Sequence, residues 1–409
     1  MNIVLEPGAA ALLDELHRAG FGAYAVGGCV RDSLLGLAPH DWDLCTAARP
    51  GQVMELFGED RCIPTGLQHG TVTVKRDGKL YEITTFRTEG RYSDGRDPDS
   101  VAFVPDLRED LARRDFTINA MAYSAEEGLC DPFGGREDLA RGVVRAVGEP
   151  LRRFGEDALR ILRLYRFAAR FGFAIDEATE AAAKQLASHL DCVSAERIEE
   201  ELNKLLAAPQ PGAYLEPEVL AFVLPELPPE ELTKARRRID ALPAGTEQVS
   251  ARWAALLLPL GETGARKALK RLKCSNARID GAVALVRECG EKTPDTLDKC
   301  DLRLQAKRLL GKYDLHTVQQ LTALWTALAP EEKASFDALR AEAEALTAQG
   351  VCCRISQLAV NGRDLMAAGA APGPGLRRVL EALLEEVITG RLPNEKTELL
   401  AFAAGFSAS

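Results

Sequence analysis

The chain has 409 residues, of which 46% are hydrophobic, and this length is sufficient for two to four domains with apolar cores. No apolar run approaches the ~18 residues of a membrane span, the N-terminus lacks the layout of a signal peptide, and ten cysteines without C-x-x-C spacing favour reduced thiols, so we expect a cytoplasmic protein without membrane contacts. The formal net charge of −10 argues against a general nucleic-acid binder, because phosphate contacts require Lys and Arg.

The first elements lead to a glycine pair. Apolar spacing predicts an amphipathic helix over residues 7–19, and an apolar strand follows at 24–26. Gly27 and Gly28 then allow the backbone to approach a polyphosphate closely, and a short helix at about 30–35 would offer its free N–H groups to the anion. Arg31 adds a forked positive charge. This segment is typical of a triphosphate-binding turn.

Two aspartates follow one residue apart, at the predicted start of the next strand. Residues i and i+2 of a strand point to the same face, so Asp41 and Asp43 could together hold divalent cations that clamp the oxygens of a phosphoryl transfer. Taken alone, each half of the pattern is equally typical of turn or capping residues. The order of strand, glycine pair, short helix and D-x-D favours nucleotidyl transfer.

A short helix at 52–57 precedes a predicted hairpin. Residues 71–75 and 79–86 flank Asp77-Gly78, which is a strong two-residue turn signal. Glu82 lies on the second strand and is the natural third carboxylate of a metal site. It could equally be a surface residue, because alternation places it on the face opposite Tyr81 and Ile83.

The next segments mix charges with turn residues. Residues 88–113 carry Gly90, Gly95 and Pro98 and are predicted to form a mobile loop near the site. In the following segment, Asp115 is placed to accept hydrogen bonds from a ribose and Arg114 to reach phosphate or base. A capping aspartate beside surface arginines is the simpler alternative.

Four polar residues recur at three-residue steps on a predicted helix over 156–166, namely Asp157, Arg160, Arg163 and Arg166. An ion-paired solvent face would have the same pattern. However, cytosine and adenine both present an amino donor beside a ring-nitrogen acceptor, whereas uracil and guanine present a carbonyl beside an N–H. A carboxylate and a guanidinium side by side would therefore admit C and A and reject U and G.

The remainder of the chain reads as helical. Proline-rich breaks at 209–217 and 225–229, and turns at 329–330 and 372–375, separate groups of helices. Basic clusters occur at 264–278, 234–238 and 303–312. Each cluster could be a solvated helix face or part of a stripe that follows an RNA backbone.

Several motifs together resemble a known family. The segments GGCVRDSLLG with DWD, GLQHGTVTV, YEITTFR, RRDFTINAMAY, DPFGGREDLARGVVRAVGEP, RRFGEDALRILRLYRFAARFGF and SAERIEEELNKLL are similar to those of bacterial CCA-adding enzymes, in the family that also holds bacterial poly(A) polymerases. The resemblance implies an α/β nucleotidyltransferase (polymerase β-like) N-terminal head domain followed by all-α neck, body and tail domains. The implied ranges are 1–140 for the head, 141–210 for the nucleotide-templating neck, 211–330 for the body and 331–409 for the tRNA-binding tail.

The resemblance also implies an activity, which is stepwise addition of C, C and A to the tRNA 3′ end from CTP and ATP, with release of pyrophosphate and with Mg²⁺ as cofactor. The implied residues are these: catalytic Asp41, Asp43 and Glu82, of which Asp41 and Asp43 bind the metal, and nucleotide-binding Gly27, Gly28, Arg31, Arg114, Asp115, Asn119, Asp157, Arg160, Arg163 and Arg166. Three alternatives stay open: an A-adding enzyme, a poly(A) polymerase, and a tRNA-binding protein without catalytic activity. The oligomeric state is also open, with a homodimer among the states considered.

Overall fold

The computed structural model describes residues 3–89, 101–291 and 301–406. The chain divides into two compact units. The first comprises Met1–Pro229 with Arg271–Lys273, and the second comprises Glu230–Lys270 with Cys274–Ser409. No described helix is long and apolar enough to cross a membrane.

A seven-stranded mixed sheet forms the centre of the N-terminal part of the first unit. Its strand order is β3-β4-β5-β2-β1-β8-β9. All neighbouring pairs are antiparallel except β2 and β5, which run parallel. The strands are β1 (Ala23–Val26), β2 (Leu44–Thr46), β3 (Cys62–Gly66), β4 (Thr71–Arg76), β5 (Lys79–Thr85), β8 (Ala122–Ser124) and β9 (Gly128–Cys130).

The predicted hairpin is confirmed as β4 and β5. Asp77 and Gly78 both have positive φ, 49° and 78°, as a tight two-residue turn requires. Across the hairpin Val74 pairs with Tyr81 and Val72 with Ile83, and these side chains are buried. Glu82 therefore points to the opposite face of the sheet.

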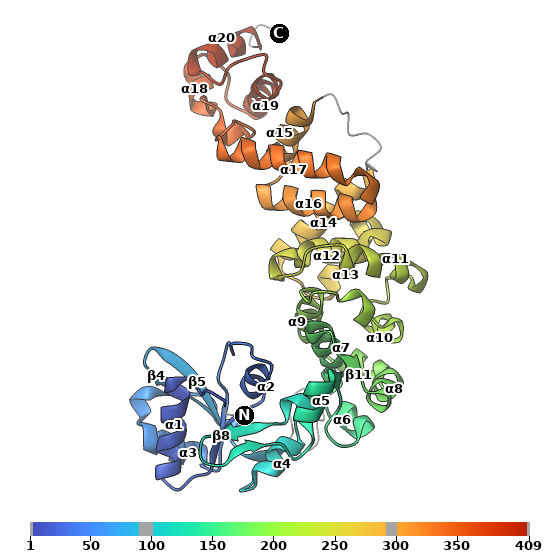
Figure 1. Cartoon of the computed structure of the whole chain (residues 1–409). Coiled ribbons are helices and arrows are strands. Elements are labelled where there is room, and N and C mark those ends of the chain that lie inside the picture. Colours follow the sequence, from blue (N-terminus) through green and yellow to red (C-terminus); the bar gives the residue numbers. More distant parts are fainter. Residues whose placement is uncertain (1–2, 90–100, 292–300, 407–409) are drawn as a thin grey trace. The chain divides into compact units, whose positions relative to one another are not determined.

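The face that carries Tyr81 is covered by the first helix. The helix α1 (Pro7–Arg18) confirms the prediction for this segment, and Glu6 caps it by accepting a hydrogen bond from the N–H of Ala9. The Tyr81 hydroxyl donates to the same carboxylate at 2.6 Å. Helices α1 and α3 (Pro50–Phe57) lie together against the strands in Figure 1. On the opposite face, which carries Glu82, a second apolar cluster buries Tyr24, Val26 and Cys45 against Leu111 of a later helix.

The two aspartates of the D-x-D pattern precede the strand that they were expected to begin. β2 starts at Leu44, and the backbone carbonyl of Asp43 accepts a hydrogen bond from the N–H of Val26 in β1. The short helix α2 (Gly28–Leu34) begins directly after β1, close to the prediction. Asp41 and Asp43 therefore lie in the connection between α2 and β2, immediately before the sheet.

The loop expected over residues 88–113 is partly wrong. Within the described residues, β6 (Arg87–Glu89) pairs with β7 (Val101–Phe103) as an antiparallel ribbon, and α4 (Leu107–Ala112) follows. Residues 90–100 lie outside the described part of the chain. Asp106 caps α4 by accepting from the N–H of Arg108, so a capping aspartate begins a helix within the expected loop.

The rest of the first unit is mainly helical, as predicted, with one exception: β10 (Val143–Val144) and β11 (Ala174–Ile175) form a short parallel pair. The single helix expected over 156–166 is wrong at its start. Helix α6 ends at Glu156, Asp157 has extended backbone, and α7 begins at Leu159. The helices are α5 (Gly135–Arg141), α6 (Pro150–Glu156), α7 (Leu159–Phe171), α8 (Glu177–Gln185), α9 (Ala195–Leu206) and α10 (Pro217–Val223).

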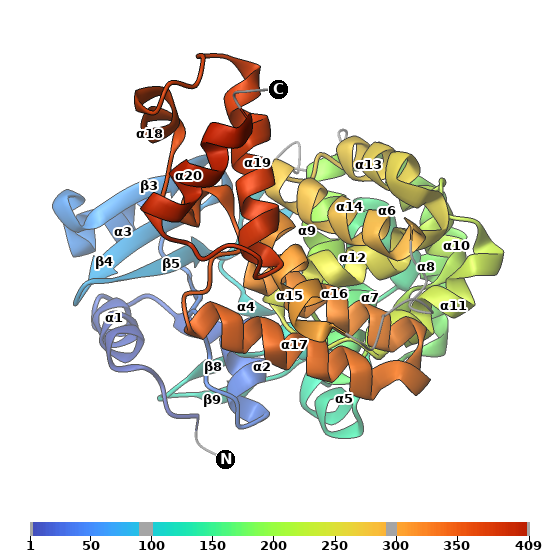
Figure 2. The ribbon, with the colours of Figure 1, turned by 90° about the horizontal axis from the view of Figure 1, so that it is seen from above.

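The described residues of the second unit form helices around a core that includes the fully buried Trp253 and Arg252. The last three helices share a separate apolar cluster with Leu365, Leu383 and Leu399 at its centre, and they lie together in Figure 2. The helices are α11 (Pro229–Asp240), α12 (Val249–Leu257), α13 (Gly261–Arg271), α14 (Asn276–Glu291), α15 (Leu302–Lys312), α16 (Leu315–Leu328), α17 (Lys333–Ala348), α18 (Gly362–Ala367), α19 (Pro374–Ile388) and α20 (Lys396–Phe406).

Candidate functional site

A cavity of about 730 Å³ opens in the first unit on the sheet face that carries Glu82. Its lining is dominated by arginine, although the whole chain is acidic. Four carboxylates also line it, those of Asp43, Glu82, Asp115 and Asp157. The lining arginines are Arg31, Arg87, Arg113, Arg114, Arg160, Arg163, Arg166, Arg170 and Arg197. Such a surplus of guanidinium groups suits a polyanionic ligand.

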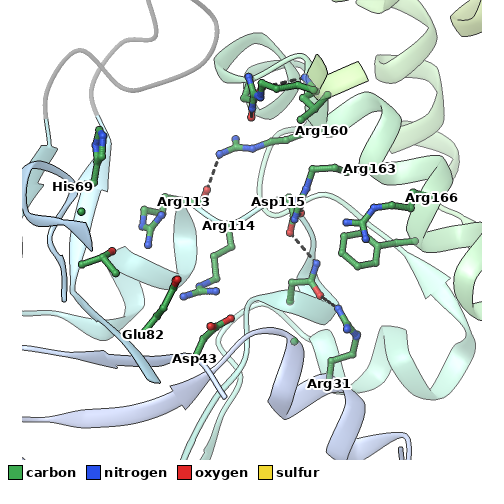
Figure 3. Close-up of a pocket in the computed structure, with 18 of the residues that line it drawn as sticks. Arg31, Asp43, His69, Glu82, Arg113, Arg114, Asp115, Arg160, Arg163 and Arg166 are labelled. Atoms are coloured by element: carbon green, nitrogen blue, oxygen red, sulfur yellow. Dashed lines mark hydrogen bonds and ion pairs between the residues drawn. The ribbon is translucent and has the colours of Figure 1, made fainter. Parts of the chain in front are cut away.

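Asp43 and Glu82 form an acidic edge of this cavity (Figure 3). Leu44 pairs with Ile83 in the parallel register of β2 and β5, so Asp43 and Glu82 both lie one residue before that pair. The Asp43 side chain is open to the cavity, yet the surrounding protein displaces enough water to raise its pKa. The charges of Glu82 and Asp41 raise it further, and Arg114 opposes them. Two carboxylates that repel each other in this way suit a cation between them.

Asp41 is placed differently from Asp43. Its side chain is 80% exposed, lies 3.0 Å from the His40 ring, and is not part of the cavity lining. It is still near enough to Asp43 to affect its pKa. The structure therefore brings Asp43 and Glu82 together and leaves Asp41 at the margin.

The glycine pair borders the cavity at the start of α2. Gly27 has a φ of +77°, a backbone conformation that favours glycine, and a β-carbon at this position would lie 2.9 Å from Nη1 of Arg114, so that guanidinium group would have to shift. Gly28 lines the cavity. Arg31 is buried, donates to Asp32 and Asn119, and lies 4.9 Å from the Phe171 ring centroid. It is thus held rigidly at the wall.

Asp115 joins the sheet to helix α7. One carboxylate oxygen accepts hydrogen bonds from the Phe116 N–H and from Asn119, at 2.8 and 3.0 Å. The other accepts from Nε and Nη2 of Arg163, at 2.8 and 2.6 Å. Burial alone would raise the pKa of Asp115, but the charge of Arg163 and the hydrogen bond from Asn119 hold it well below its usual range. Asp115 is therefore ionised and fully engaged.

The expected base-reading residues all line the cavity. Asp157 lies between α6 and α7, where one carboxylate oxygen accepts from the Leu159 N–H at 3.0 Å and the other from Arg197 at 3.1 Å. Arg160 is buried and donates to Glu156 at 3.0 Å and to the carbonyl of Arg113 at 3.1 Å. These contacts fix the orientation of both side chains.

Arg166 continues the same wall of the cavity. It pairs with Glu201 of α9 at 2.6 Å and lies over the Phe167 ring, 4.0 Å from its centroid. Figure 3 shows Arg160, Arg163 and Arg166 projecting from the same side of the cavity. The three-residue spacing in the sequence thus produced a row of guanidinium groups, as expected.

Four of the lining arginines were not among the predicted site residues, namely Arg87, Arg113, Arg170 and Arg197. Arg170 follows Arg166 by one helical turn and pairs with Asp32 at 3.1 Å, so extending the arginine row would have found it. Arg197 lies in α9, forty residues after its partner Asp157. No local signal links these two positions.

The basic clusters of the rear half are largely paired with acidic residues. In the cluster at 264–278, Arg266 pairs with Asp280, Arg271 with Glu226 and Lys273 with Glu196. Lys234, Arg303, Arg308 and Lys312 also pair with acidic residues. Lys267 and Lys270 of α13 are exposed.

Three family models match parts of the chain. The model "Poly A polymerase head domain" matches residues 23–145, which hold the sheet and the acidic edge. "Probable RNA and SrmB- binding site of polymerase A" matches 172–228, and "tRNA nucleotidyltransferase domain 2 putative" matches 245–403.

Full-length relatives give the same picture. The CCA-adding enzyme of Limosilactobacillus fermentum is 39% identical over 96% of this chain and 95% of its own length. That of Geobacillus stearothermophilus is 37% identical over 96% of this chain and 95% of its own. The chain belongs to the CCA-adding enzyme family. The members of this family are nucleotidyltransferases, and the predicted fold class and family are therefore confirmed.

A solved CCA-adding enzyme supports this assignment. The crystal structure of the Bacillus stearothermophilus CCA-adding enzyme in complex with CTP has a TM-score of 0.81 and 33% identity, covering 99% of this chain and 98% of its own. The fold of this chain is thus that of a CCA-adding enzyme.

Proposed function

We propose that this chain adds C, C and A stepwise to the 3′ end of tRNA from CTP and ATP, releasing pyrophosphate. The observation that carries the proposal is the combination of an arginine-lined cavity with the acidic edge of Asp43 and Glu82. Phosphoryl transfer needs positive groups to hold the polyphosphate and acidic groups to hold the metal ions that act on it. The relatives named CCA-adding enzyme supply the choice of substrates.

Magnesium fits the acidic edge. Carboxylate oxygens are the ligands that this hard cation prefers, and it usually binds through one or two of them together with substrate phosphates and water. Within the described residues no group of three or more His, Cys, Asp or Glu side chains could hold a metal unaided. We assign Asp43 and Glu82, with Asp41 beside them, as the residues that would hold Mg²⁺ together with the substrate phosphates. When bound, the metal would neutralise the charge that develops on the reacting oxygens.

The remaining residues would bind and select the nucleotide. Gly27, Gly28 and Arg31 border the space for the triphosphate, and Arg114 approaches it from the side of the sheet. Asp157 would accept a hydrogen bond from the amino group of cytosine or adenine, and Arg160 would donate to the ring nitrogen beside it. Arg163 and Arg166 would complete the pocket, while Asp115 and Asn119 hold Arg163 and Arg31 in place.

Each of the four proposed domains has its own role. We assign residues 1–140 as the catalytic head, 141–210 as the neck that templates the nucleotide, 211–330 as the body and 331–409 as the tail that holds tRNA. A cytoplasmic location is in keeping with cysteines that are all free within the described residues.

The experiment that tests nucleotidyl transfer measures pyrophosphate release. A tRNA transcript that ends before the CCA is incubated with Mg²⁺ and each of the four ribonucleoside triphosphates in turn, and release is followed with time. We expect release with CTP, with ATP only after both C residues have been added, and none with UTP or GTP. No release under any condition would contradict the proposal and leave a tRNA-binding protein.

A further inference from the structure

The two walls of the cavity differ in chemistry. One wall carries the arginine row of α7, whereas the other is formed where β3 leads into β4 and contributes Thr65, His69 and Thr71. Figure 3 shows His69 across the cavity from Arg160, Arg163 and Arg166, with Asp43 and Glu82 between the two sides in that view. The second wall is polar and also carries Arg87, which donates to the backbone carbonyl of His69.

Reaction geometry gives this second wall a role, which rests on the proposed function. In phosphoryl transfer the attacking and leaving oxygens lie roughly in line on opposite sides of the phosphorus. The triphosphate is expected beside Gly28 and the arginines, on one side of the acidic edge. The acceptor hydroxyl must then approach from the other side, where His69 lies.

The turn that carries His69 is rigidly held. The backbone carbonyl of His69 accepts a hydrogen bond from Nη1 of Arg87, and the carbonyl of Gly70 accepts one from the N–H of Thr85 at 2.9 Å. The His69 ring is half-buried and Nε2 lies 3.0 Å from Nε2 of Gln68. A fixed backbone below a partly open imidazole is suited to positioning a ligand.

An exposed aromatic ring adjoins the same turn. Phe103 of β7 pairs with Arg87 and packs over Gly70, where a β-carbon would lie 2.7 Å from its Cε1 atom. It nevertheless remains 36% exposed. Unpaired bases of single-stranded RNA ends commonly stack on such rings.

We propose that Phe103 and His69 form the seat of the 3′-terminal nucleotide of the acceptor RNA. The terminal base stacks on Phe103, and the imidazole of His69 hydrogen-bonds to the sugar-phosphate of the same nucleotide. The seat holds the acceptor hydroxyl toward Asp43 and Glu82. Phe103 and His69 are thus acceptor-binding residues and do not touch the incoming nucleotide.

The test separates the KM for RNA from the KM for ATP. The acceptor is a short hairpin RNA with a tRNA acceptor stem that ends in CC, and each substrate is varied while the other is saturating. We expect Phe103→Ala to raise the KM for RNA by about 10-fold, because one base–aromatic stack is lost, and to leave the KM for ATP unchanged. His69→Ala should raise the KM for RNA by about 3- to 10-fold, and His69→Asn should recover part of it.

Two further variants make the test decisive. Phe103→Trp should keep the KM for RNA near that of the unmodified chain, whereas Phe103→Leu, which preserves an apolar side chain without an aromatic face, should raise it. Leu80→Ala is the control, because Leu80 is an exposed apolar residue of β5, at 61%, outside the cavity and outside the segment that matches the RNA-binding-site model.

Two results would contradict the proposal that Phe103 and His69 bind the terminal nucleotide of the acceptor RNA. An unchanged KM for RNA in Phe103→Leu and His69→Ala would do so, as would an equal rise in the KM for ATP. These results leave the proposed function intact if the unmodified chain extends the hairpin. Failure of the unmodified chain to extend any acceptor would instead refute the proposed function itself.

Discussion

The environment of Asp43 is unfavourable to its own charge. Enclosure in the cavity raises its pKa, and Glu82 and Asp41 add repulsion. The folded chain therefore binds the Asp43 proton more tightly than the unfolded chain. Stability is accordingly lost as the pH rises above the unfolded pKa, near 3.8, and through the raised folded pKa.

Replacing this charge should stabilise the fold and abolish the activity. At pH 7 we expect Asp43→Asn to gain up to about 1 kcal/mol of stability, a gain limited by water in the open cavity. The gain should vanish near pH 4 and below, where Asp43 is protonated in both states. Thermal unfolding followed by circular dichroism at the two pH values checks this, and nucleotide addition should fall at least about 100-fold.

The control for this variant is Asp41→Asn, because the Asp41 side chain is 80% exposed. Its stability should stay close to that of the unmodified chain at both pH values. A lower unfolding temperature for Asp43→Asn at pH 7 would contradict the electrostatic account of the acidic edge.

Metal binding should reverse the repulsion at the same edge. We expect millimolar Mg²⁺ to raise the unfolding temperature of the unmodified chain, because a ligand that binds only the folded state stabilises it. The Asp43→Asn variant should respond much less. Equal responses of the two proteins to Mg²⁺ would place the metal elsewhere.

Asp157 should decide which bases are accepted. Asp157→Ala removes the acceptor for the amino group of cytosine and adenine, so the preference for CTP and ATP over UTP and GTP should fall about 10- to 100-fold, the range for one good base contact. The ratio of kcat/KM values for the four nucleotides measures this. Asp176→Ala is the control, because Asp176 also caps a helix but lies outside the cavity. Unchanged selectivity in Asp157→Ala would disprove the base-reading role.

At the scale of elements, the contact between the sheet and α7 depends on a buried ion pair. Asp115 is 7% exposed. Two hydrogen bonds from Arg163 stabilise its negative charge and fix the orientation of its carboxylate. Because the pKa of Asp115 is lowered, this pair contributes stability above the unfolded pKa of about 3.8 and loses it as the pH falls through the folded pKa.

Arg163→Met should therefore destabilise the chain at neutral pH. It leaves a buried carboxylate without its cation, which typically costs about 3 kcal/mol or more. The deficit should shrink as the pH falls into the acid range, because Asp115 then becomes protonated in the folded variant before it does in the folded unmodified chain. Urea unfolding at several pH values measures it. A deficit that is constant with pH would mean that the variant disturbs packing and not charge.

The elements that the sequence predicted best are those set by local signals. Asp77-Gly78 identified the hairpin because only a few residue types accept the positive φ that the turn requires. The break between α6 and α7 was missed, since the spacing of Asp157 and the arginines continues a helical period across it. Its cause is the Asp157 side chain, which caps the Leu159 N–H and so begins a new helix.

The site was predictable where motifs lie close together in the chain and was missed where partners are distant. Asp43, Glu82 and three arginines of α7 (Arg160, Arg163 and Arg166) line the cavity as expected. The pairing of Asp157 with Arg197 and of Arg166 with Glu201 depends on how α7 packs against α9. Such packing leaves no signature in the local sequence of either helix.

At the scale of the whole molecule, an acidic chain must still bind RNA. In the described part of the rear half many cations are paired with acidic residues, so phosphate contacts are better assigned to exposed cations outside those pairs. Lys267 and Lys270 are exposed on α13 and suit this role. Replacing both with alanine should weaken tRNA binding and reduce the slope of log K against log salt by about 1 for each phosphate that is no longer neutralised.

Filter binding at several salt concentrations measures that slope. Lys79→Ala is the control, because Lys79 is an exposed lysine of the head that is already paired with Glu6. Its slope should match that of the unmodified chain. An unchanged slope in the double variant would exclude α13 from the RNA-binding surface.

The measurement that tests the central claim most directly uses three tRNA transcripts, ending before the CCA, after the first C and after CC. Each is incubated with Mg²⁺ and with CTP, ATP or both, and the products are resolved to single nucleotides. We predict that all three are completed to CCA and that addition then stops. Extension of the CC-ended transcript alone would identify an A-adding enzyme, and long A tails on unrelated RNA would identify a poly(A) polymerase; either result would contradict the account.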